Sequence, residues 1–226
     1  EGAVAVEGDP EHGVSRGRLL PDHTLLGEDV VPDSTRRALM RSLVLVHGGM
    51  SQDVGPILEM VTERYLLRTA PSWQCRKQAV GLLDEILAAL RSGNTGSLAR
   101  ATTRHFEGPV QGIIPWATNL FTETVIGRVR ERFGSDFAGF CMLGGMSGGG
   151  MAFLFEPRAR EAALDGLQEI LSITKRELEH ALPFAMDPVI YNFEINPHGS
   201  TCEIDAPHEQ RAPARTTPVA AAHAEQ

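Results

Sequence analysis

A glycine-rich segment at residues 144–150 is the stretch of this chain best suited to chemistry. Five glycines and one serine occupy these seven positions, and apolar runs at 137–143 and 151–155 flank them as expected strands. Glycine allows positive φ angles and close approach by other groups, and successive N–H groups without Cβ atoms can cradle a phosphate. A tight, bulged hairpin turn uses glycine for the same conformational reason. The segment therefore predicts either an anion-binding loop or a structural turn.

A second candidate group consists of polar and charged side chains between residues 102 and 123. Arg104 could hold a phosphate bidentately, and His105 and Glu107 could contact sugar hydroxyls. Asn119, Thr122 and Glu123 could add an amide, a hydroxyl and a carboxylate from the start of the next helix, although ordinary capping and surface decoration are the favoured explanation. Neither His105 nor Glu107 is tied to a nucleophile or to an orienting partner, so no catalytic residue is predicted.

Three further groups each allow a functional and a structural interpretation. His47–Gly49 lies between an expected strand and an expected helix, where backbone amides could hold an anion or simply form a turn. Arg68, Trp73, Arg76 and Lys77 could meet a phosphate or form a solvated corner in which Trp73 is a packing anchor. The cations and acids at 175–180 suit the end of a helix, where positive charge offsets the helix dipole. For all three groups the structural interpretation is favoured.

Composition and charge exclude several classes of protein. The 226 residues carry a net charge of −8, and no cluster of Lys and Arg predicts a nucleic-acid surface. The three cysteines are too far apart for a zinc site and indicate a reducing compartment, hence the cytoplasm. No apolar run is long enough to span a membrane, so no membrane partner is expected. The chain opens on Glu1 rather than Met, which is compatible with a piece of a longer polypeptide.

Apolar spacing predicts a compact domain over residues 38–196. Residues 1–37 are expected to be a weakly ordered arm or linker and residues 197–226 a disordered tail. Within the domain, period-2 and period-3.6 patterns predict the following elements in order: a strand at 42–47, helices at 54–65, 72–92, 95–106 and 117–133, strands at 137–143 and 151–155, a helix at 157–178 and a strand at 188–195. A loop is expected at 109–115. This order predicts an α+β fold in which helices cover a small antiparallel sheet.

The run Leu143-Gly-Gly-Met-Ser-Gly-Gly-Gly-Met151 resembles the third conserved motif of the GHMP small-molecule kinases. That motif is a glycine- and alanine-rich run between two antiparallel strands, followed by a helix and a closing strand. The fucokinase branch is the most similar, since Glu63–Arg68 and Thr102-Thr103 also match its pattern. The resemblance covers about residues 40–196 and implies a ferredoxin-like GHMP kinase C-terminal domain.

Two departures from the family pattern stand out. Met146 and Ser147 interrupt a run that normally keeps glycine or alanine, and the segment after Thr103 lacks the aromatic–Gln–Lys pattern of the branch. The family's second motif, which makes the main ATP phosphate loop, is absent from the 226 residues. The catalytic Asp of the family belongs to the N-terminal lobe. The resemblance therefore implies a lobe that is inactive alone.

The function implied by the resemblance is the C-terminal lobe of an ATP-dependent sugar kinase, a phosphotransferase with an alcohol group as acceptor. ATP and Mg²⁺ would be the cofactors of the full-length parent, and the partners would be its N-terminal kinase lobe, the nucleotide and the sugar. The implied nucleotide contacts are Gly144, Gly145, Ser147, Gly148, Gly149 and Gly150. The implied sugar contacts are Arg104, His105, Glu107, Asn119 and Glu123. A non-catalytic binding module with a structural glycine hairpin remains the alternative, and an unrelated α+β domain with such a hairpin is a third possibility.

Overall fold

The structure is a computed structural model, and it describes residues 3–8, 15–20, 26–50, 53–144 and 150–196, with side chains from residue 26 onward. The chain divides into two units, Glu1–Ile195 and Asn196–Gln226. The expected tail at 197–226 lies outside the described residues. The fold below is therefore that of the first unit.

The N-terminal region contains two strands and a helix. β1 (Ala3–Gly8) pairs antiparallel with β2 (Ser15–Leu20) along its full length. The helix α1 (Asp33–Ser42) was not among the elements predicted from the sequence. Its first-turn Asp33 forms an ion pair with Arg37 one turn later, and the acidic charge suits the positive end of the helix dipole. α1 leads directly into the first strand of the main sheet.

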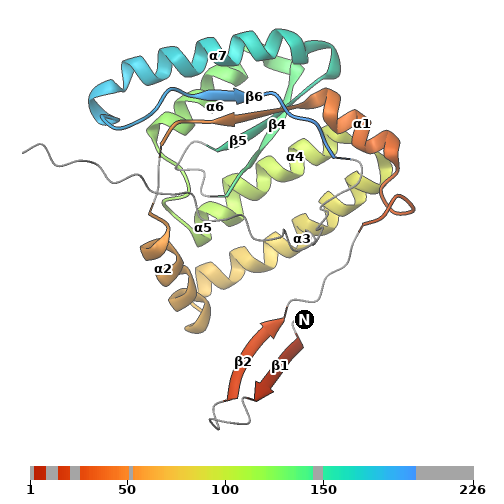
Figure 1. The fold of residues 1–226 in the computed structure, drawn as a ribbon, viewed down its shortest axis with the longest axis vertical. Coiled ribbons are helices and arrows are strands. Elements are labelled where there is room, and N and C mark those ends of the chain that lie inside the picture. Colours follow the sequence, from red (N-terminus) through yellow and green to blue (C-terminus); the bar gives the residue numbers. More distant parts are fainter. Residues whose placement is uncertain (1–2, 9–14, 21–25, 51–52, 145–149, 197–226) are drawn as a thin grey trace, which may run out of the picture. The chain divides into compact units, whose positions relative to one another are not determined.

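Within the described residues, the main sheet has four strands in the order β4-β5-β3-β6, with antiparallel neighbours throughout (Figure 1). The strands are β3 (Leu43–His47), β4 (Phe137–Met142), β5 (Met151–Phe155) and β6 (Val189–Tyr191). The predicted α+β fold with one small antiparallel sheet is confirmed. Along the chain the order is β3, helices, β4, β5, α7 and β6. In the sheet, β3 and β5 occupy the centre and β4 and β6 the edges.

The core lies between this sheet and two helices, α6 (Leu120–Phe133) and α7 (Arg160–Glu177). Val44 and Val46 of β3 are buried and are paired with Phe153 and Met151 of β5, which are also buried. α6 and α7 pack against each other. Both helices bury the apolar faces that period-3.6 spacing predicted, including these side chains: Phe121, Val125, Val129, Ala163, Leu167, Ile170 and Leu171.

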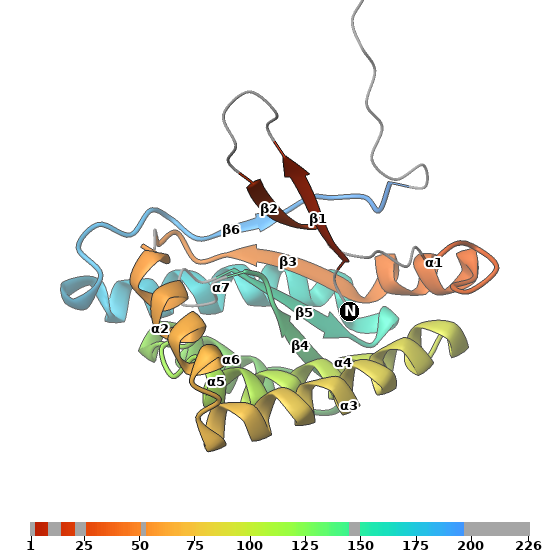
Figure 2. The ribbon, with the colours of Figure 1, turned by 90° about the horizontal axis from the view of Figure 1, so that it is seen from below.

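A second group of helices extends beyond β4. α2 (Gly55–Leu66) is followed by α3 (Ala70–Ser92) and α4 (Thr95–His105), and α3 and α4 run side by side (Figure 2). Gly93, at φ +70°, ends α3, and the Asn94 side chain accepts the Ser97 N–H at 2.9 Å to start α4. A left-handed glycine after one helix and an Asn cap before the next explain why the chain reverses here.

Two predicted segments differ from the structure. The expected loop at 109–115 is largely helical: a π-helical turn (Phe106–Val110) leads into α5 (Gln111–Ile113), because Phe106 and Val110 are buried in the core and anchor the backbone. The closing strand is Val189–Tyr191 rather than 188–195. Across the described ranges, no helix combines the length and the apolar character needed to cross a bilayer.

Candidate functional site

The glycine-rich segment leaves the sheet at the end where β3 finishes. Met142 and Met151 are paired with each other on β4 and β5, and Met151 also pairs with Val46, next to His47 at the end of β3. His47 in turn pairs with Val189 at the start of β6. Leu143, Gly144 and Gly150, the described ends of the glycine-rich segment, and the connection into β6 therefore share one end of the sheet, which we call the loop end.

α6 begins at the same end. Its C-terminus leads through residues 134–136 into the start of β4, so its N-terminus lies where β4 finishes (Figure 1). α4 also approaches this end, because Ala99 lies against Gly139 and Thr103 against the later Phe140. The start of α6 thus lies at the loop end, whereas Arg104 and Glu107 do not: Glu107 pairs with Arg130 in the last turn of α6, and Arg104 lines a hollow with Ala138 near the start of β4.

The described ends of the glycine-rich segment are Gly144 and Gly150. Gly144 has φ +54°, which favours glycine, and no described atom lies within 4 Å of the position that its Cβ would take. The Leu143 N–H donates to the Gly150 carbonyl at 3.1 Å and closes the hairpin. The other candidate contacts of this segment, Gly145, Ser147, Gly148 and Gly149, lie outside the described residues. Positive φ at Gly144 suits an anion nest and a turn equally.

Arg104 and Glu107 take part in ion pairs with neighbouring helices. Arg104 pairs with Glu85 of α3, and Glu107 pairs with Arg130 of α6. All four side chains are about half exposed. Such pairs contribute about 1 kcal/mol or less, so either side chain can be released at small cost.

His105 occupies the last position of α4 and is partly buried. Burial lowers its pKa below the usual 6.5, since removing the ring from water disfavours the charged form. The imidazole is therefore neutral at pH 7 and offers one donor and one acceptor.

Asn119 is the N-cap of α6. Its Oδ1 accepts the Thr122 N–H at 3.0 Å, and Thr122 Oγ1 accepts the Asn119 N–H at 3.0 Å, which completes a reciprocal capping box. Glu123 is exposed in the first turn, where a negative charge suits the helix dipole. For Asn119, the structure thus supplies the capping role that the sequence left as an alternative.

Gly49 holds the turn after β3 in place. It has φ +81°, its N–H donates to His47 Nδ1 at 3.0 Å, and its carbonyl accepts the Met186 N–H at 2.8 Å. A Cβ on Gly49 would lie 2.1 Å from the Met186 carbonyl oxygen. Close backbone approach therefore explains this glycine, and the turn interpretation of His47–Gly49 holds without an anion.

Thr103 links α4 to the edge of the sheet, a role that the sequence analysis missed. Its Oγ1 accepts the Phe140 N–H at 2.9 Å and donates to the Ala99 carbonyl at 2.8 Å. Gly139 makes this contact possible: its φ is +151°, and its Cβ would lie 2.5 Å from the Ala99 carbonyl oxygen. A glycine within a strand pattern often marks such a close approach, and this was the available signal.

Exposed apolar side chains surround the loop end. Leu143 is 39% exposed and Phe184 95% exposed, and the others come from the α5–α6 and α7–β6 connections. We call this set the apolar rim; its members are Trp116, Leu120, Leu143, Phe184 and Met186. Single exposed apolar residues are normal, but several at one end of a sheet are typical of a surface that another group covers.

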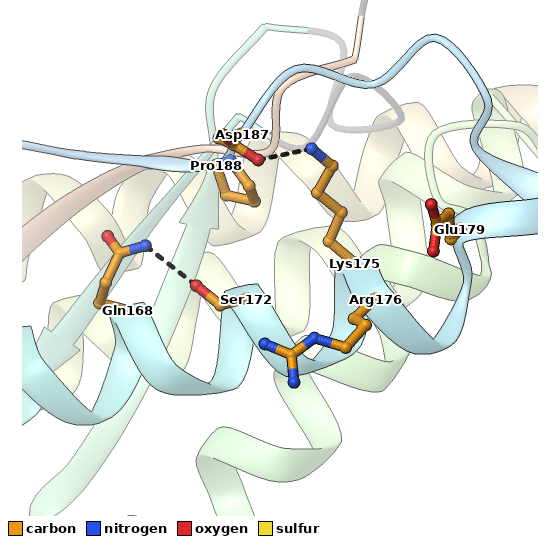
Figure 3. A pocket seen from close by; sticks show the side chains of 7 residues that line it. All are labelled: Gln168, Ser172, Lys175, Arg176, Glu179, Asp187 and Pro188. Carbon is orange, nitrogen blue, oxygen red and sulfur yellow. Dashed lines mark hydrogen bonds and ion pairs between the residues drawn. The ribbon is translucent and has the colours of Figure 1, made fainter.

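A cavity of about 490 Å³ lies between the outer face of α7 and the segment entering β6 (Figure 3). Lys175 Nζ lies 2.6 Å from Asp187 Oδ1, and Gln168 donates to Ser172 at 3.3 Å. The hydrogen bond and the charge of Lys175 lower the pKa of Asp187. Two acids, Glu179 and Asp187, and two bases, Lys175 and Arg176, line this cavity. Its charges therefore favour neither an anionic nor a cationic ligand.

Comparisons with known proteins add no assignment. No protein-family model matches the chain, and the search of curated proteins finds no match. Among the described side chains, no group of three or more His, Cys, Asp or Glu residues could hold a metal ion.

Proposed function

We propose that the chain is the C-terminal lobe of an ATP-dependent sugar kinase of the GHMP type, similar to the fucokinase branch, and that it acts in the cytoplasm together with an N-terminal lobe. One observation carries the proposal. The described ends of the glycine-rich connection, Leu143–Gly144 and Gly150, leave the sheet at the end where α6 begins. A phosphate loop and an acceptor pocket must meet in this way for a phosphoryl group to pass between them.

The strand order supports the proposal. Numbered along the chain, the four strands of the main sheet lie in the order 4-1-3-2 from β6 to β4, which is the ferredoxin-like arrangement that the resemblance implies. Fold alone does not fix function, because one fold hosts many activities. The position of the glycine-rich segment within this fold is the more specific support.

Each part of the loop end would have a distinct role. Backbone N–H groups of residues 144–150 would donate to phosphate oxygens of ATP and stabilise charge that develops during transfer. Mg²⁺ would neutralise phosphate charge, and the N-terminal lobe would supply the main phosphate loop and the catalytic Asp. His105, Asn119 and Glu123 would line the sugar pocket.

The apolar rim fits a lobe that packs against this end. Large apolar groups such as Trp116, which is 58% exposed, gain free energy when a partner surface removes them from water. An N-terminal lobe would cover them and exclude water from the transferring phosphate at the same time.

A second candidate function is a non-catalytic interaction module built on the same lobe. The observation that favours it is the structural use of the acceptor candidates: Arg104 and Glu107 form ion pairs, and Asn119 caps α6. In that case the glycine hairpin is a turn.

Kinase assays separate the two functions. The purified 226-residue chain is incubated with MgATP and a panel of free sugars, next to the product of the complete reading frame and heat-killed controls. We expect no turnover by the chain alone and phosphorylation of a fucose-like sugar by the complete product. Turnover by the chain alone would contradict the assignment as a single lobe. A folded complete product that phosphorylates no sugar would favour the interaction module.

A further inference from the structure

The corner where α2 meets α3 carries a stack of four aromatic and cationic side chains. The Tyr65 and Trp73 rings lie 6.2 Å apart between centroids. The Arg68 guanidinium lies 5.3 Å from the Trp73 ring centre, and the Arg76 guanidinium lies 4.9 Å from the Tyr65 ring centre. Both distances are within the range of cation–π attraction. We call this set the Arg–aromatic corner.

Arg68 adopts a backbone conformation that normally requires glycine. Its φ is +48°, and among the described non-glycine residues it alone has positive φ. The Thr69 N–H donates to the Arg64 carbonyl and the Arg68 N–H to the Tyr65 carbonyl, both at 3.2 Å, which is the Schellman pattern with Arg68 at the position where glycine is preferred. A side chain at this position is therefore kept despite a backbone cost.

Within the part of the chain that the structure describes, the cations of the corner also have no acidic partners. Arg37, Arg104, Arg130 and Arg158 each form an ion pair with an acid. Among the described residues no acid pairs with Arg68 or Arg76, and the Arg76 Nε is buried without a hydrogen-bond partner. Arg41, Arg64 and Arg91 also have no acidic partner among the described residues, so the buried Nε of Arg76 without a hydrogen-bond partner is what distinguishes the corner.

Apolar side chains adjoin these cations. Leu66 is 72% exposed and Leu67 is 68% exposed. None of the twelve described residues of α2 is buried, although a helix of this length is marginal in water without packing. Exposed leucines beside Tyr, Trp and Arg match the composition of protein-interface hot spots.

We propose that the Arg–aromatic corner is a docking surface for an acidic segment of a partner protein, in which Asp or Glu side chains alternate with apolar ones. The carboxylates would pair with Arg68 and with the Nη groups of Arg76, since the Arg76 Nε is buried, while the faces of both guanidinium groups stack on the rings. The apolar side chains of the segment would cover Leu66 and Leu67. A nucleic acid is the less favoured occupant, because the net charge of −8 opposes a polyphosphate.

Trp73 provides the binding signal. The chain has two tryptophans, so a Trp116→Phe background leaves Trp73 as the sole indole. The probes are a synthetic peptide of alternating leucine and glutamate, the same peptide with lysine in place of glutamate, and a single-stranded oligonucleotide. We expect the glutamate peptide alone to change the Trp73 fluorescence in a saturable and salt-sensitive way.

Two substitutions then test the cations. Arg68→Gly and Arg76→Gln should each weaken binding of the glutamate peptide about tenfold, the scale of an interface hot spot. Arg37→Gln, which removes a paired arginine of α1, is the matched control and should bind as the parent does. Arg68→Gly should melt at the same temperature or higher, since glycine relieves the positive φ, and a loss of binding therefore cannot be ascribed to unfolding.

Three results would overturn the proposal. They are equal binding of the glutamate and lysine peptides, unchanged affinity in both Arg68→Gly and Arg76→Gln, or saturable binding of the oligonucleotide alone. The last result would assign the corner to a nucleic acid instead.

Discussion

α6 and α2 carry similar apolar spacing but have opposite environments. α6 buries Phe121, Val125 and Val129 against the sheet, whereas none of the twelve described residues of α2 is buried and its Leu58 is 58% exposed. Period-3.6 spacing therefore identifies an apolar helix face, but it does not say whether the same chain covers that face. The buried contacts that stabilise this chain are therefore those of the main sheet with α6 and α7, whereas α2 lies on the surface.

The largest effect should come from the centre of the sheet. Phe153, which is fully buried in β5, is replaced by Ala, and the exposed Leu66 of α2 is replaced by Ala as the control. We expect Phe153→Ala to lower the free energy of unfolding by about 3–5 kcal/mol and Leu66→Ala to change it by about 0.5 kcal/mol or less. Urea denaturation measures both. Equal losses would contradict the division into core and surface.

The contact between α4 and β4 should be the next most sensitive. Gly139→Ala places a Cβ 2.5 Å from the Ala99 carbonyl oxygen at a φ of +151°. The variant should lose about 2 kcal/mol or more, because both the contact and the backbone angle oppose a side chain. Gly127→Ala is the control: no described atom lies near its Cβ, and alanine within α6 should stabilise by about 0.5–1 kcal/mol. Thermal melts that show no difference between the two would disprove the close approach.

A smaller effect is expected for the hydroxyl that links these elements. Thr103→Val removes the acceptor of the Phe140 N–H and should cost about 1–2 kcal/mol, since a backbone donor loses its partner. Thr102→Val serves as the control, because Thr102 Oγ1 bonds only to carbonyls of its own helix among the described atoms. Hydrogen exchange of the Phe140 amide should quicken in Thr103→Val and remain unchanged in Thr102→Val. Similar exchange in both variants would remove Thr103 from this role.

The smallest effect concerns His105 and pH. Burial lowers its pKa in the folded state, so the unfolded chain binds more protons below about pH 6.5. Stability contributed by neutral His105 is therefore complete above pH 6.5 and declines as the pH falls below it. His105→Gln should flatten this part of the pH profile of the melting temperature. An identical profile in His105→Gln would show that the burial of His105 has no energetic consequence.

The elements with strong apolar periodicity were predicted correctly. β3, β4, β5 and the faces of α6 and α7 follow from the sequence because each contributes buried side chains to the core. β6, whose Val189 is 46% exposed, was predicted too long. α1 was missed. The helical segment at 106–113 was taken in part for a loop, because Gly108, Gly112 and Pro109 are typical of turns while Phe106 and Val110 anchor it to the core.

The candidate site could be predicted only in part. The location of the start of α6 beside the glycine-rich segment's described ends follows from strand order. The partners of Arg104 and Glu107, however, lie on α3 and α6, and such contacts depend on how helices pack rather than on local sequence. The same holds for Thr103, whose Phe140 partner is 37 residues away.

The most direct test of the proposed kinase function is steady-state kinetics of the complete reading-frame product with Gly149→Val. Gly149 lies outside the described residues, and the expectation follows from the resemblance: loss of one well-placed backbone donor should lower kcat about a hundredfold, with little change in melting temperature. Met146→Gly, which restores a small residue, is the matched control and should have a mild effect. A folded Gly149→Val enzyme with unchanged kcat would contradict a phosphate role for the glycine-rich segment.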